Sequence, residues 1–295
     1  MIKKLWNTIA LLITFSFCVT LSADDTAKTY FPATPDSFWV YEDQDGNEIT
    51  RRAIEGEEIA GETYHAFEYE PAFEDWENYE YYIHPMLFKV DDEGINVKIG
   101  DEVKKAYKEI IENEIKATMQ EAPAPPEFNI KFDVKVDVDV QDHFLLLPTQ
   151  FTLNEEWKSM RIKPYVKVTS SLKNAEVDTE LAGFSQTATI YFSIMESGMI
   201  TDKESVETQA GKFDDCLKIV YRTETVMPNL PGNDQTEVGE SVTTLWLAPN
   251  VGIVKFHQES QTPIILEFGN DESTTEVKTL ELKKYEIKSE KAEGE

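Results

Sequence analysis

The sequence predicts a mainly β protein, built as a curved antiparallel sheet or half-barrel with one amphipathic helix. Residues 206–257 alternate strand-forming segments with glycine and proline turns, which is typical of up-and-down antiparallel structure. Residues 128–141 alternate apolar and polar side chains without a break, as in a sheet with one buried face. Residues 103–115 instead place apolar side chains at helical spacing.

The first 23 residues have the features of a signal peptide. Lys3 and Lys4 precede an apolar run, and Leu21-Ser22-Ala23 provides a small-residue cleavage site. The run is too short for a transmembrane anchor, and no later segment approaches spanning length. Cys18 follows a phenylalanine where a lipoprotein signal has a small residue, so lipid attachment at Cys18 is not expected. We therefore predict export to the periplasm or the cell exterior.

Residues 24–100 are predicted to form an N-terminal β half. Its first two strands, 38–41 and 49–54, flank Asp45-Gly46, which is a strong hairpin signal. Short turns then separate four further strands. These are predicted at residues 64–69, 79–83, 87–90 and 95–99.

Residues 101–127 are predicted to form a helix and a proline-rich linker. The apolar residues of the helix follow the i, i+3, i+4 pattern, and they are Val103, Ala106, Tyr107, Ile110, Ile111 and Ile115. Ala122 to Pro126 contains three prolines and ends the helix, because proline cannot continue it. This segment is the best boundary in the chain.

Residues 128–288 are predicted to form a C-terminal β half, followed by a charged tail at 289–295. Its first strand, 128–141, is long enough to bend around a curved sheet. Later strands are predicted at 165–170, 187–195, 204–208, 214–226, 242–247, 253–257, 264–268 and 277–287. Similar glycine turns in the two halves suggest either two related β halves or chance reuse of such turns in a β protein.

Composition excludes several classes of partner and site. With 28 basic and 56 acidic residues and a net charge of −28, the chain has the wrong sign for binding nucleic acid or anionic lipid headgroups. Cys216 is the single cysteine after the signal, so a disulfide and a structural zinc site are excluded. The four histidines are scattered, and no catalytic or phosphate-binding motif occurs. We therefore predict no catalytic residue, metal or cofactor.

One segment interleaves aromatic and acidic residues, and it gives the only candidate for a binding site. Trp76, Tyr79 and Tyr81 lie within residues 73–82 and are candidates for stacking on sugar rings or on a cationic ligand. The structural alternative is that Tyr79 and Tyr81 form one face of a strand, with Trp76 closing a loop over the core.

Three motifs resemble a diffuse group of exported bacterial proteins, many of them lipoproteins containing domains of unknown function. They are Phe38-Trp39-Val40-Tyr41, Ala210-Gly211-Lys-Phe-Asp-Asp-Cys216-Leu217 and the W-x-A-P-x-V-G-x-V-K motif from Trp246 to Lys255. The resemblance implies a curved or lipocalin-like half-barrel related in shape to lipid carriers. It transfers no catalytic residue.

We therefore expect a non-catalytic binding or carrier protein of the cell envelope or exterior. Its ligand would be an apolar small molecule, a lipid or a glycan. The alternatives are a carbohydrate-active hydrolase or its accessory module, and a structural surface protein. A carboxylate with a raised pKa in a cleft would favour the hydrolase. A roomy apolar cavity would favour the carrier, and a filled core with an exposed sheet edge would favour the structural protein.

Overall fold

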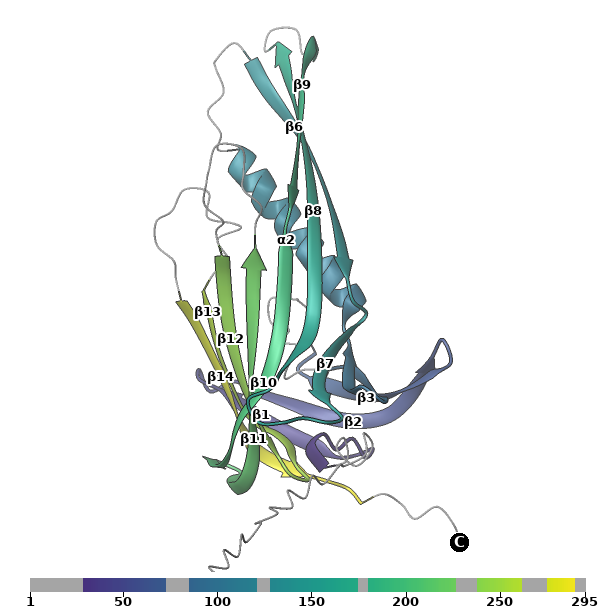
Figure 1. The fold of residues 1–295 in the computed structure, drawn as a ribbon, viewed down its shortest axis with the longest axis vertical. Coiled ribbons are helices and arrows are strands. Elements are labelled where there is room, and N and C mark those ends of the chain that lie inside the picture. The colour runs from purple at the N-terminus through teal and green to yellow at the C-terminus, as the bar shows by residue number, and fades with distance from the viewer. Residues whose placement is uncertain are drawn as a thin grey trace, which may run out of the picture.

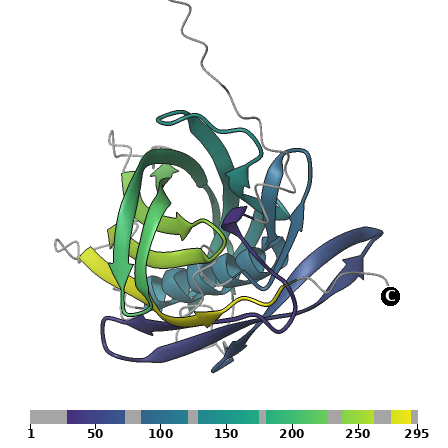
Figure 2. The same cartoon turned by 90° about the horizontal axis from the view of Figure 1, so that it is seen from below.

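The computed structural model describes residues 29–72, 85–120, 128–174, 180–226, 238–261 and 275–289. Their strands join one antiparallel 14-stranded sheet in the order β6-β8-β10-β11-β12-β13-β14-β1-β2-β3-β4-β5-β7, with β9 pairing with β8. The sheet is strongly curved and is not closed into a barrel (Figures 1 and 2). The predicted fold class is confirmed.

The strands and the helix have the following bounds in chain order: β1 (Phe38–Asp43), β2 (Glu48–Ile59), β3 (Glu62–Glu70), β4 (Leu87–Val90), β5 (Gly94–Lys98), α2 (Gly100–Gln120), β6 (Phe128–Val140), β7 (His143–Pro148), β8 (Glu156–Asn174), β9 (Glu180–Tyr191), β10 (Ser193–Thr208), β11 (Gly211–Val226), β12 (Val238–Ala248), β13 (Gly252–Gln261) and β14 (Thr275–Glu286). The strands predicted at 79–83 and 264–268 lie outside the described residues, as does the signal peptide.

Strands from the beginning and the end of the chain lie side by side. β1 pairs with β14 through Phe38–Glu286 and Trp39–Tyr285, and with β2 on its other edge. β5 pairs with β7, which follows the helix. Strands on both sides of the predicted linker therefore belong to one sheet.

The sheet has two regions. We call β1–β5, β7, residues 156–161 of β8 and β10–β14 the body. The second region consists of β6, β9 and residues 162–174 of β8, which extend beyond the body in Figure 1, and we call it the finger. β10 continues β9 after a break at Phe192, so the same edge of β8 pairs first with β10 and then with β9.

The long alternating segment forms the finger's first strand as predicted. Val136 and Val138 are buried and Val134 is half-buried, while Lys135 and Asp137 are exposed. The alternation holds because successive side chains of a strand point to opposite faces. The buried face looks into the concave side of the sheet.

The helix lies within the curve of the sheet (Figure 2). Val103, Ala106 and Ile111 are buried, and Tyr107 and Ile115 pack against the same core. The helix thus covers the concave face with its predicted apolar stripe. The helix extends beyond the periodic segment 103–115 at both ends, and it ends at Gln120, just before the proline-rich segment that was predicted to end it.

Candidate functional site

The predicted ligand-binding residues Trp76, Tyr79 and Tyr81 lie outside the described residues. Their role therefore stays a prediction. In the described part of the chain, two other places are considered first as candidate sites. One is a surface pocket beside the start of α2, and the other is a buried arginine among aromatic rings.

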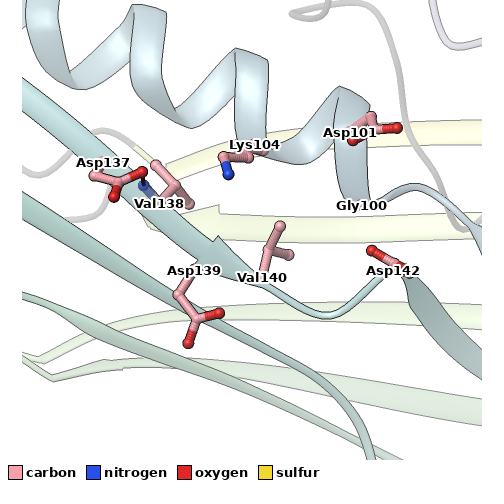
Figure 3. A pocket seen from close by; sticks show the side chains of 8 residues that line it. All are labelled: Gly100, Asp101, Lys104, Asp137, Val138, Asp139, Val140 and Asp142. Atoms are coloured by element: carbon pink, nitrogen blue, oxygen red, sulfur yellow. Dashed lines mark hydrogen bonds between the residues drawn. The ribbon is translucent and has the colours of Figure 1, made fainter.

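The pocket has a volume of about 280 Å³ and lies between the start of α2 and the end of β6 (Figure 3). Its lining residues are Gly100, Asp101, Lys104, Asp137, Val138, Asp139, Val140 and Asp142. The carbonyl oxygen of Asp142 accepts hydrogen bonds from the backbone N–H groups of Ile99 and Gly100, both at 3.0 Å. These two bonds fix the start of the helix against the bend between β6 and β7.

The carboxylates of this pocket do not converge on one point. Strand alternation turns Asp137 and Asp139 to the exposed face, away from Val138. The Asp137 carboxylate accepts a hydrogen bond from the N–H of Val138 at 3.0 Å, and Asp139 lies 3.7 Å from the Arg161 guanidinium. Within the described residues, no group of three or more His, Cys, Asp or Glu side chains is placed to hold a metal ion. The pocket is an open polar hollow that offers no paired acid and base.

The second place is a guanidinium enclosed by aromatic rings. Arg51 of β2 is 1% exposed, and its Cζ lies 4.3 Å from the ring centroid of Trp39 and 4.7 Å from that of Phe67. The rings of Phe31 and Tyr41 lie at 5.5 and 5.6 Å. Among the described residues, Arg51 Nε and Nη1 have no hydrogen-bond partner. Cation–π attraction of about 2 kcal/mol for a desolvated pair offsets part of the cost of burying this charge.

Two of the motifs singled out in the sequence, Phe38–Tyr41 and Trp246–Lys255, meet beside this arginine. Trp39 Nε1 donates to the carbonyl of Val251 at 2.7 Å, and Tyr41 Oη donates to that of Ile253 at 3.1 Å. Gly252 has φ +94°, a conformation that favours glycine. Burial raises the pKa of Tyr41 to about 12, and the nearby Arg51 lowers it by a smaller amount. These two motifs therefore fasten β1 to the β12–β13 turn.

A buried carboxylate stands where the helix faces β10. Glu196 is 2% exposed and accepts a hydrogen bond from Thr223 Oγ1 at 3.0 Å. The pKa of Tyr107 on α2 is raised to about 12, mainly by burial and further by the charge of Glu196. Glu196 thus lies beside the contact between the helix and the sheet.

Sequence reasoning missed both Arg51 and Glu196. Each occupies an inward position of an alternating strand, Arg51 between Ile49 and Ala53, and Glu196 between Ile194 and Gly198. A charged residue at an inward position is the signal that could have found them. The sequence prediction did not use this signal, because it covered only part of each strand and did not say which side chains point inward.

Cys216 is buried, as its apolar strand predicts. Burial raises the pKa of its thiol to about 11, and Sγ lies 3.5 Å from the carbonyl oxygen of Phe213. A thiol in this state is unsuited to nucleophilic chemistry at neutral pH.

Comparison with known proteins gives one family and two remote structures. The model of a family described as DUF3108-like matches residues 110–261. A structure from Bacteroides fragilis NCTC 9343, named for export and a YmcC-like fold, is 14% identical with a TM-score of 0.39, covering 88% of this chain and 99% of its own. A structure from Parabacteroides distasonis ATCC 8503, named as a lipoprotein, is 14% identical with a TM-score of 0.34 and the same coverage. No curated protein is significantly similar.

Proposed function

We propose that this chain, which belongs to the DUF3108-like family, is an exported, non-catalytic protein that binds an apolar ligand between α2 and the concave face of its sheet. The proposal rests on the apolar side chains that form this face. In the finger, the face consists of apolar side chains from β6 and β8, and α2 is the element that covers it. These residues are Phe132, Val134, Val136, Val138, Val166 and Val168.

The helix is held to the sheet in a way that permits opening. Its start is fixed by the hydrogen bonds from Ile99 and Gly100 to Asp142. The rest of the helix contacts β6, and the side chains of Val103 and Ile111 belong to the same hydrophobic core as those of β6. Side-chain packing can separate without breaking a strand ladder, so α2 can move from the sheet while the strands remain paired.

Export is part of the proposal and rests on the signal features of residues 1–23. No helix in the described part of the chain is long and apolar enough to cross a membrane. An exported protein that shields an apolar face beneath a movable helix is suited to carrying a lipid or a similar apolar molecule.

A polarity-sensitive dye tests the binding. We expect N-phenylnaphthylamine to bind the mature protein saturably and to be displaced by a long-chain fatty acid. Ile115→Ser weakens the packing of α2 and should increase the rate of dye uptake, whereas the exposed Asn113→Ser should leave the rate unchanged. Absence of saturable dye binding, together with a native mass equal to that of the bare polypeptide from its own host, would contradict the proposal.

The structural surface protein is the second candidate, and one observation favours it. Strand β9 leaves one edge without a partner among the described strands. An open edge of this kind is a surface for assembly. The dye measurement separates the two candidates, because a purely structural protein has no saturable apolar site. For a carbohydrate-active hydrolase, the non-converging carboxylates beside α2 offer no support.

A further inference from the structure

The finger has two edges, and they differ in chemistry. On one edge β6 carries a charged residue at every second position, namely Lys131, Asp133, Lys135, Asp137 and Asp139. On the other edge, β9 contains no charged residue from Leu181 to Tyr191. Charged side chains on an edge strand deter pairing with another chain. The β6 edge is protected in this way, and the β9 edge is not.

The β9 edge is also accessible. β9 pairs with β8 on one side, regularly from Tyr165–Tyr191 to Ser171–Ser185 and, after an irregularity in register, at Lys173–Glu180. No described strand pairs with its other side. Residues 185–189 are all exposed, and Tyr191 is 56% exposed. Half of the N–H and C=O groups of an edge strand point outward, where a further strand can bind them.

The charge near this edge differs from that of the chain as a whole. The chain as a whole has a net charge of −28, which opposes self-association. The neighbouring strand β8, however, contains no acidic residue from Trp157 to Asn174, and its basic residues there are Lys158, Arg161, Lys163, Lys167 and Lys173. At the β9 edge, two copies therefore meet without acidic residues facing each other.

We propose that two copies of this chain pair through their β9 strands, antiparallel and centred on Thr187. This register places Thr187 opposite itself and Thr189 opposite Ser185 of the second copy. Hydroxyl pairs of this kind stabilise antiparallel strands. The resulting contact is isologous, so it closes as a two-fold dimer and does not extend into a filament.

The dimer goes beyond the proposed ligand binding and does not depend on it, because α2 and the concave face are not part of the β9 edge. Failure of the dye experiment would leave the dimer standing, and a monomer could still bind dye.

Cysteine cross-linking tests the register. Thr187→Cys places two thiols opposite each other across the two-fold axis, within reach of a disulfide, so mild oxidation should give a covalent dimer. The control, Thr189→Cys, places its own two copies four residues apart along the strands, about 13 Å, and should not cross-link with itself. A mixture of Ser185→Cys and Thr189→Cys proteins should cross-link. The native Cys216 is buried and should not interfere.

Sedimentation velocity tests the dimer itself. Wild type should sediment as a dimer at tens of micromolar. Thr187→Lys should raise the dissociation constant at least tenfold, because it puts two like charges opposite each other. Asp133→Lys, which changes the charge on the β6 edge, should not weaken the dimer. A monomer at 100 µM for wild type would overturn the proposal, and equal cross-linking of Thr187→Cys and Thr189→Cys would overturn the register.

Discussion

The body and the finger are parts of one sheet, but they bury their side chains differently. In the body, opposite walls of the curved sheet face each other and share a core. Tyr221 of β11 donates a hydrogen bond to the carbonyl of Leu146 in β7 at 2.5 Å, across the interior. In the finger, a single layer of strands has one apolar face, and that face depends on α2 for cover.

At one place in the body, side chains join β7 and β8, which are not neighbours in the strand order. β7 pairs with β5 at one end of the strand order, yet Trp157 of β8 donates to the carbonyl of Leu145 at 3.2 Å. The ring of Trp157 lies over Gly198, where a Cβ atom would come within 2.5 Å of the ring. Side chains therefore bridge a gap that backbone pairing leaves open. A destabilising substitution in the body should therefore affect both walls, whereas one in the finger should have a local effect.

The largest effect is expected from Trp39→Ala in the body. It removes a fully buried indole and leaves the Val251 carbonyl without its donor, so the free energy of unfolding should fall by about 4 kcal/mol. Urea unfolding should show one transition at lower urea. The control is Trp246→Ala, a half-buried ring on the outer side of β12, which should cost less than half as much. A loss confined to β1, with the other strands still protected from hydrogen exchange, would contradict the spreading of damage through the body.

Val136→Asp in the finger should cost about 3 kcal/mol, because it buries a carboxylate without a partner. The finger can open locally while the body stays folded, and this limits the loss in the free energy of unfolding. Hydrogen exchange should therefore accelerate in β6, β8 and β9 and remain slow in β11 to β13. Asp137→Val, on the exposed face of the same strand, should change stability by less than about 0.5 kcal/mol. If both variants melted like wild type, the alternating segment would not be a core strand.

Local features of both regions are predicted well from the sequence. The alternation of residues 128–140 gives both the strand and its buried face, because side-chain direction in a strand depends only on position. The hairpin around Asp45-Gly46 is predicted equally well, since its turn residues determine the local geometry. Such features depend on neighbours in the sequence.

Features that depend on distant contacts were missed. β7 was not predicted, although His143 to Pro148 contains three consecutive leucines, because a short apolar run does not distinguish a strand from other buried structure. The aromatic enclosure of Arg51 joins residues from β1, β2, β3 and the segment before β1, and no local pattern reveals it. The charge contrast between the finger's edges is present in the sequence, but it gains meaning only when the pairing order shows which strands are edges.

Tyr221→Phe removes one hydroxyl group from the body and so tests the hydrogen bond between its opposite walls. The Leu146 carbonyl would lose its donor while the ring packing with Phe144 remains, so we expect a loss of about 1.5 kcal/mol. The matched control is Tyr165→Phe in the finger, whose hydroxyl makes no hydrogen bond among those described, and it should change stability by less than about 0.5 kcal/mol. Thermal unfolding of the two variants gives the comparison directly, and equal losses would mean that the cross-wall hydrogen bond contributes nothing.

Cys216→Ala should produce the smallest loss, about 1 kcal/mol at pH 7, from the lost apolar burial of one sulfur atom. The pH dependence gives the sharper test. Burial raises the pKa of this thiol from 9.0 to about 11, so the unfolded chain ionises at lower pH than the folded chain. The thiol's contribution to stability is therefore complete below pH 9 and is lost as the pH rises from about 9 to 11. Over that range, wild type should lose stability more steeply than Cys216→Ala, while the buried tyrosines contribute equally to both proteins. At pH 8, a thiol reagent such as dithionitrobenzoate should label wild type only at the rate of unfolding. Rapid labelling of the folded protein, or parallel pH profiles for the two proteins, would show that the wall formed by β11 opens more readily than a core closed from both sides allows.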